Sequence, residues 1–231
     1  MIETTDRQPH SHLDTQGLLR LMAWLSPAFP VGGFAWSGGL ERAVHDRLVT
    51  DAASLSRWTT TVLRHGSLWT DAVLFCQAWR QHADRQAVEE LAELGLALAG
   101  SAERHVETLS LGTAFVTAAV AWPHPVFDYL PQDTPFPVAV GAISAAHGLA
   151  CEKALAAYLH AAVSQWISAA IRLGVCGQAD GVRLLAGTEG AIGAICESAG
   201  TLTLDDLGTA TVQAEICTLR HEVQHSRLFR S

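Results

Sequence analysis

The chain has 231 residues, long enough for one globular domain with a sizeable core. Apolar residues make up 49% of it and charged residues only 16%, so it can bury enough apolar surface to offset the entropy cost of folding, which excludes disorder over most of its length. The formal net charge of −8 argues against nucleic acid as the main partner, because no net positive field is available to displace counterions.

The start of the chain is polar, and we expect residues 1–16 to form a flexible lead-in to a single all-helical domain over 17–231. No apolar h-region is visible there, which argues against a secretory signal. The five cysteines are widely spaced, odd in number and without a C-x-x-C pair. This pattern favours reduced thiols in a cytoplasmic protein over disulfides or a cysteine metal site.

Proline placement gives the clearest architectural signal, because proline breaks helix interiors. No proline occurs between Val31 and Trp122 or after Pro137. Two long helical regions are therefore expected, joined by a proline-rich loop around 123–137. Apolar residues recur at steps of three and four, without sustained strand-like alternation. The predicted fold class is all-α, a single-domain bundle of about nine or ten helices. The helices are predicted at 17–25, 38–48, 51–65, 68–82, 84–102, 105–121, 138–150, 152–173 and 179–199, with shorter helical pieces after 204.

Two uncharged stretches, 108–127 and 154–171, are long enough to be mistaken for membrane spans. The first contains two prolines and a histidine, and the second contains His160, Ser164 and Gln165. Both therefore favour buried helices of a protein without a membrane segment.

Two smaller features also bear on the helices. Thr203 followed by Asp206 is typical of a capping box at the start of a short helix. Gly187, Gly190 and Gly193 fall three apart inside the predicted 179–199 helix. They indicate either a close approach of another backbone or plain tolerance of glycine in an Ala/Gly-rich sequence.

The segment SPAFPVGGFAWSGGLE, residues 26–41, is the most unusual stretch of the chain. Its aromatic side chains lie among turn residues, where they need a partner surface or a core pocket. Its glycines either support such a surface or simply allow a tight left-handed turn. A phosphate loop is excluded, because Gly39 and Leu40 stand where lysine and a hydroxyl residue would be required.

Near the end of the chain, His221-Glu222-Val223-Gln224-His225 matches the H-E-x-x-H zinc motif. Composition alone predicts about 0.03 such matches by chance. The context argues against a protease, because only six residues follow His225 and a catalytic zinc needs a third protein ligand.

The last residues, Ser226–Ser231, mix Leu228 and Phe229 with two arginines. Such a peptide could dock on a partner, with an aromatic anchor and cations that pair with carboxylates. The alternative is that Phe229 packs back on its own domain.

At both ends the sequence resembles the UreF family of urease accessory proteins. The segment 26–41 is similar to that family's signature, and RHEVQHSRLFRS is similar to its ending. Weaker similarity is found at RLGVCGQADG (172–181) and at Arg104-x-x-Glu107 with Gly112. One departure is His225, where the family more typically has tyrosine, so the zinc motif is interpreted as an accident of one substitution.

The resemblance implies an all-α protein, often dimeric, that is not an enzyme and acts in urease maturation. The implied partners are the accessory protein UreD (also called UreH), the GTPase UreG, apo-urease and a second copy of the chain, in a complex that delivers nickel in a GTP-dependent manner. The resemblance assigns no catalytic, metal-binding or cofactor-binding residue to this chain. The residues carried over as candidate partner contacts are Pro30, Gly32, Gly33, Phe34, Ser37, Glu41, Gln178, Asp180, His221, Glu222, Ser226, Arg227, Leu228, Phe229 and Arg230. The alternatives are a zinc hydrolase built on His221, Glu222 and His225, and a helical interaction domain without a link to urease.

Overall fold

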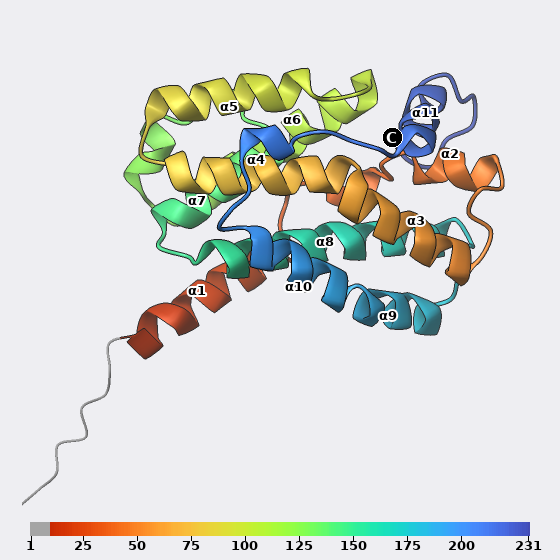
Figure 1. Ribbon diagram of the computed structural model, residues 1–231, viewed down its shortest axis with the longest axis horizontal. Coiled ribbons are helices and arrows are strands. Elements are labelled where there is room, and N and C mark those ends of the chain that lie inside the picture. The colour runs from red at the N-terminus through yellow and green to blue at the C-terminus, as the bar shows by residue number, and fades with distance from the viewer. Residues whose placement is uncertain (1–9) are drawn as a thin grey trace, which may run out of the picture.

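The computed structural model describes residues 10–231, with side chains described from residue 15 onward. Over this range the protein is all-helical, with eleven α-helices, three short 3₁₀ helices and no strand (Figure 1). The elements are α1 (His10–Trp24), η1 (Gly33–Ala35), α2 (Leu40–His45), α3 (Ala52–His65), α4 (Ser67–Gln81), α5 (Arg85–Ala97), α6 (Ala102–Ala119), η2 (Pro125–Asp128), α7 (Phe136–Ala146), α8 (Cys151–Arg172), α9 (Gln178–Gly187), α10 (Glu189–Ser198), η3 (Leu204–Asp206) and α11 (Val212–His221).

The prediction of an all-α, single-domain fold is confirmed, with differences at several helix ends. Helix α1 begins at His10 rather than at 17, and residues 1–9 of the predicted lead-in lie outside the described residues. The predicted helix 38–48 begins only at Leu40, because Gly38 and Gly39 have φ angles of 59° and 79°, in the left-handed region. The capping box between Thr203 and Asp206 is confirmed and opens η3.

The predicted helix 179–199 is two helices, α9 and α10, that meet at Thr188. The Thr188 hydroxyl donates to the Leu185 carbonyl at 2.7 Å, which satisfies a carbonyl at the end of α9. An added Cβ at Gly187, Gly190 or Gly193 would meet nothing within 4 Å. The hypothesis of a close backbone approach along these glycines is therefore wrong for this chain, and glycine is simply tolerated there.

The proline-rich loop lies where it was predicted, although α7 begins inside it. Pro125 opens η2, Pro135 is the N-cap of α7 and Pro137 lies in its first turn. A proline is accommodated at these positions because the first amide groups of a helix have no intrahelical acceptor.

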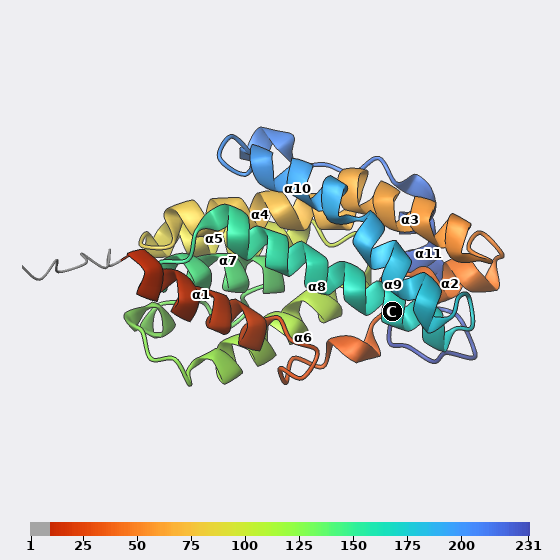
Figure 2. The same ribbon diagram turned by 90° about the horizontal axis from the view of Figure 1, so that it is seen from below.

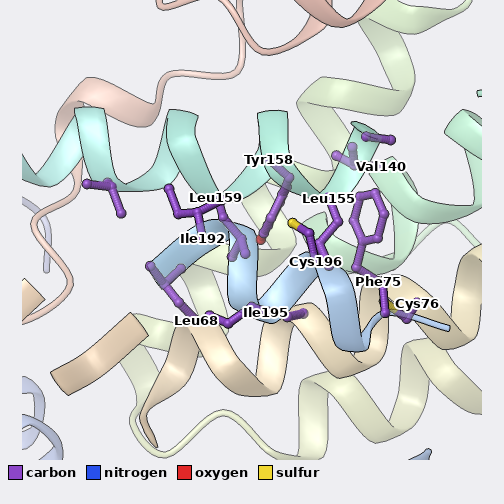
Figure 3. Close-up of a cluster of buried hydrophobic side chains, with 14 of the residues drawn as sticks. Leu68, Phe75, Cys76, Val140, Leu155, Tyr158, Leu159, Ile192, Ile195 and Cys196 are labelled. Carbon is purple, nitrogen blue, oxygen red and sulfur yellow. The ribbon is translucent and has the colours of Figure 1, made fainter. Parts of the chain in front are cut away.

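The core lies between α4, α7 and α8, with α10 covering one side (Figures 1 and 2). Every residue of α7 from Pro137 to Ala145 is buried, as expected for an interior helix that is apolar all round. Phe75 of α4, Leu155 of α8 and Ile195 of α10 belong to one cluster of buried side chains (Figure 3).

Helix α8 is long and apolar enough to span a membrane by length and composition alone, but half of its most apolar window is buried inside the protein. It packs against α4, α7, α9 and α10. Among the described residues it is the one helix that meets this test, and its neighbours make it the central core helix that the sequence predicted.

Candidate functional site

Two distant parts of the chain meet at one end of the molecule. Segment 26–41 follows α1, and the residues after α11 fold back onto it, so that the C-terminal residues lie beside α2 and α11 (Figure 1). We call residues 26–41 together with 221–231 the loop–tail assembly. It contains thirteen of the fifteen predicted contact residues, all except Gln178 and Asp180.

The backbone of segment 26–41 depends on glycine. Gly32 has a φ of 76° at the start of η1, in the left-handed region. Gly39 combines a φ of 79° with close packing, because an added Cβ would lie 2.7 Å from Thr218 Cγ2. The structural interpretation of these glycines as turn residues is thus confirmed for Gly32, and Gly39 also allows α11 to approach.

Main-chain hydrogen bonds join the last residues to this segment. The Arg230 amide donates to the Ala35 carbonyl at 2.8 Å, and the Ser37 amide donates to the Ser231 carbonyl at 3.0 Å. The Ser37 hydroxyl also donates to Ser231 O, and the Gly38 amide donates to Ser231 Oγ at 3.2 Å. Both serines are buried, so these bonds form out of contact with water.

Glu41 is the central acceptor of the assembly. Its carboxylate is buried and accepts from the amides of Leu228 at 2.7 Å and Phe229 at 2.9 Å. The Nε2 atom of His221 lies 3.1 Å from the same group. Two backbone amides, and the His221 ring when its Nε2 atom carries a proton, therefore donate to one buried carboxylate, which compensates for its lost hydration.

His221 has no exposed surface and lies between two carboxylates. Its Nδ1 atom is 2.8 Å from Glu103 Oε2, and Glu103 also accepts from Arg227 at 2.7 Å. A doubly protonated ring donates to Glu41 and Glu103 together, whereas a neutral ring can donate to only one of them. This ion cluster ties α2, α6 and the tail to each other.

The zinc-hydrolase alternative does not fit this geometry. Helix α11 ends at His221, so His225 lies beyond the helix and not one turn along the same face. Glu222 accepts from the Ala102 amide at 2.8 Å, and both nitrogens of His221 face carboxylates. No ring nitrogen of His221 is therefore left to bind zinc. The described residues contain no group of three or more His, Cys, Asp or Glu that could hold a metal ion.

Phe229 packs inside its own domain, as the second of the two hypotheses for the tail had it. It is 4% exposed, in a cluster with Leu40, Val49 and Cys217. Arg172 at the end of α8 covers its ring, with the guanidinium carbon 4.2 Å from the ring centroid, and donates to the Phe34 carbonyl at 2.7 Å. Phe229 is therefore not a free docking anchor in this structure.

The outward face of the assembly carries apolar side chains instead. Phe34 is 72% exposed and Leu228 is 61% exposed, and Val223, which the sequence analysis did not select, is 77% exposed. Pro30, Ser226, Arg227 and Arg230 are also exposed, and Arg230 stacks on Trp36 at 4.9 Å. The surface is therefore held rigidly by buried polar contacts and presents separate apolar and cationic groups to solvent.

Gln178 and Asp180 lie apart from this network, in the first turn of α9. Gln178 is exposed, and the Asp180 carboxylate pairs with Arg183 one turn further along the same helix. The structure does not bring them into the hydrogen bonds that join the loop to the tail, so they form a separate candidate surface.

The weaker sequence patch at Arg104 and Glu107 is a buried ion cluster. Arg104 lies 2.7 Å from both oxygens of Asp71 and 3.2 Å from Glu107, and the Tyr158 hydroxyl donates to Asp71 at 2.8 Å. Burial raises the pKa of Glu107 and, together with the Asp71 charge, raises that of Tyr158. These groups line a mostly apolar cavity of about 570 Å³ that extends beneath segment 26–38.

Two residues outside the loop–tail assembly contact it, although the sequence selected neither of them as a contact residue. Glu103 and Arg172 complete it from α6 and α8, far along the chain from the residues they contact. Only the fold brings them together, so periodicity and motif spacing could not have selected them for this role.

The fold and the loop–tail assembly together define an all-helical protein with a rigid surface built from two distant parts of its chain. The UreF family model matches residues 49–189. Urease accessory protein UreF of Agrobacterium fabrum is 60% identical over 214 residues, covering 93% of this chain and 96% of its own. The protein of the same name from Rhizobium etli is 59% identical, covering 94% and 98%, and that from Rhizobium meliloti is 53% identical, covering 95% and 99%. The chain therefore belongs to the UreF family.

Proposed function

We propose that this chain is a scaffold in urease maturation, which binds the accessory protein UreD (also called UreH) and the GTPase UreG and so promotes GTP-dependent nickel insertion into apo-urease. The relatives that it matches along almost their whole length are named urease accessory proteins, which supports the pathway. In this role the chain binds its partners and catalyses no reaction. The proposal places it in the cytoplasm, as a homodimer.

The observation that carries the binding role is the loop–tail assembly. Side chains that a partner can bury completely against a rigid base are the ones that contribute most to protein–protein affinity. Phe34 and Leu228 meet this description, since both are mostly exposed while the backbone beneath them is fixed by buried hydrogen bonds. Some residues predicted as partner contacts, such as Phe229 and Glu41, are buried. In this proposal they act indirectly, by holding in place the backbone that carries the exposed side chains.

Substitution of the exposed side chains tests the proposal more cleanly than deletion of the tail, because deletion would also remove Phe229 from the core. The double variant Phe34→Ala/Leu228→Ala should weaken co-purification with UreD or UreG at least tenfold, since loss of a central contact costs about 2 kcal/mol or more. Its circular dichroism and melting temperature should match those of the unmodified protein.

Val120→Ala is the matched control, because Val120 is 52% exposed at the end of α6, outside the assembly. It should leave both co-purifications unchanged. Equal capture of UreD and UreG by the double variant and the unmodified protein would reject the loop–tail assembly as the binding surface. Light scattering of the purified chain tests the homodimer separately.

A further inference from the structure

Two cysteine thiols are in contact near the start of α8. The Sγ atoms of Cys76 and Cys151 are 3.8 Å apart, within hydrogen-bond distance for sulfur. Cys76 lies in the middle of α4 and is fully buried, whereas Cys151 is the first residue of α8 and only partly buried. Cys76 thus lies wholly inside the core, whereas Cys151 lies at its edge and keeps part of its surface exposed.

The surroundings of Cys151 favour its thiolate form. It stands at the N-terminus of a 22-residue helix, where the helix dipole stabilises negative charge. The hydrogen bond between the two thiols lowers the pKa of Cys151, and the Arg80 guanidinium acts in the same direction against the opposing effect of burial. The same hydrogen bond and burial raise the pKa of Cys76.

We propose that Cys151 is an oxidation site for hydrogen peroxide and that Cys76 is the thiol that resolves the product to a disulfide. The Cys151 thiolate attacks one peroxide oxygen, the O–O bond breaks, and a sulfenic acid and hydroxide form; the hydroxide takes a proton to become water. The Cys76 sulfur then attacks the Cys151 sulfur as its own proton leaves, and the sulfenic oxygen departs as water. Two thiols are oxidised and one peroxide is reduced to two water molecules.

The disulfide needs the two sulfur atoms to approach from 3.8 Å to about 2.05 Å, and α4 and α8 already pack against each other there. Cys196 on α10 is a competitor, because it interacts electrostatically with both thiols and lies in the same buried cluster as Cys76 (Figure 3). It is 7% exposed, and burial raises its pKa to about 11, so it remains a protonated thiol. Cys217 is fully buried as well.

The test is a thiol count on the reduced, purified chain after a small molar excess of hydrogen peroxide, with alkylation in denaturant and peptide mapping. All five cysteines are unpaired in the structure, so we expect two of five thiols to be lost, a product lighter by two hydrogen atoms, and a Cys76–Cys151 linked peptide. Retention of all five thiols under conditions that oxidise a free low-pKa thiol would overturn the proposal. So would a disulfide that contains Cys196, or one that joins two chains through Cys176.

Three serine variants assign the roles. Cys151→Ser should retain its four remaining thiols, whereas the matched control Cys196→Ser should still form the disulfide. Cys76→Ser should leave a sulfenic acid on Cys151 that dimedone labels. Dimedone labelling of Cys76 in the Cys151→Ser variant would reverse the assigned roles and contradict the mechanism. Circular dichroism on each variant confirms that the fold is intact before oxidation.

Discussion

Glu41 connects parts of the chain that are far apart in sequence. Its two oxygens accept from the Leu228 and Phe229 amides and face His221, all about 180 to 190 residues away. A carboxylate is suited to this position because it only accepts hydrogen bonds, and both backbone amides that face it can only donate. Position 41 therefore requires a negatively charged side chain with two acceptor oxygens, and not only a side chain of the right size.

Replacement of Glu41 by glutamine tests this requirement. One oxygen becomes an NH₂ group, which opposes the Leu228 amide in one orientation of the glutamine, and the Phe229 amide together with His221 in the other. We expect the free energy of unfolding to fall by about 3 kcal/mol, measured by urea denaturation. Glu89→Gln is the matched control, because the Glu89–Arg85 pair is exposed and should contribute less than about 1 kcal/mol. Equal small losses for the two variants would show that the buried carboxylate is not required.

At the scale of residues, the sequence indicated which two segments form the candidate site, but not which of their side chains are buried and which are exposed. The unusual composition of 26–41 and of the tail selected both halves of the loop–tail assembly. It could not show that they contact each other, or that Phe229 points inward while Phe34 points outward. Local pattern carries no information about contacts between residues so far apart, and a phenylalanine in a turn fits a core or a surface equally well.

At the scale of elements, glycine sets how closely helices and loops approach. An added Cβ at Gly141 of α7 would lie 2.4 Å from the Phe75 carbonyl oxygen of α4, so the two backbones meet there. At Gly112 of α6 it would lie 2.0 Å from the Thr134 carbonyl oxygen, in the loop that leads into α7. These neighbours are backbone atoms, which cannot move aside as a flexible side chain can.

Gly112→Ala should therefore destabilise the protein by about 1–3 kcal/mol, because the loop before α7 must shift to admit a methyl group. Gly193→Ala, inside α10, is the matched control with nothing within 4 Å of the added Cβ. It should stabilise the protein by roughly 0.5–1 kcal/mol, since alanine loses less backbone entropy in a helix. Thermal or urea denaturation distinguishes the two, and a stabilised Gly112→Ala variant would contradict the close approach.

Helix positions were largely predictable, because proline and apolar periodicity act within a few residues. The exceptions also have physical causes. Gly38 and Gly39 delay the start of α2 through their positive φ angles, and at Thr188 the backbone amide bonds to Leu185 three residues back where α9 ends. Such stops depend on backbone geometry, which a pattern of apolar side chains does not record.

At the scale of the whole molecule, α8 links two sites. It begins at Cys151, in the thiol pair, and ends at Arg172, which covers Phe229. A helix of 22 residues is about 33 Å long, so the two ends are far apart on one rigid element. Formation of the Cys76–Cys151 disulfide is therefore expected to leave the loop–tail assembly in place.

His147 lies where α1, α7 and the loop after α6 meet. Its Nδ1 atom accepts from Arg20 at 3.1 Å, and its ring lies 5.3 Å from that of Trp24 and 5.1 Å from that of His124. Burial, followed by the charges of Arg20 and His124, lowers the pKa of His147 from 6.5 to about 4. A histidine at a helix C-terminus would ordinarily gain from protonation, but here the neighbouring cation and desolvation are the larger effects.

The sign of the resulting pH dependence follows from the lowered pKa. Above pH 6.5 the ring is neutral in both states and its contribution to stability is fully present. As the pH falls from 6.5 to about 4, the unfolded chain binds a proton that the folded chain does not, so stability is lost. The loss is at most about 1.4 kcal/mol per pH unit, and smaller here because the ring is partly exposed.

His147→Asn should reduce this acid sensitivity, because an amide oxygen can accept from Arg20 without titrating. The measurement is the urea midpoint of the protein and of the variant between pH 7 and pH 4, compared as a difference at each pH. The variant should be relatively more stable toward the acid end, and Arg20→Met should give part of the same effect by removing the neighbouring cation. Parallel curves for the unmodified protein and His147→Asn would show that the junction of α1, α7 and the 120–124 loop does not exclude the proton.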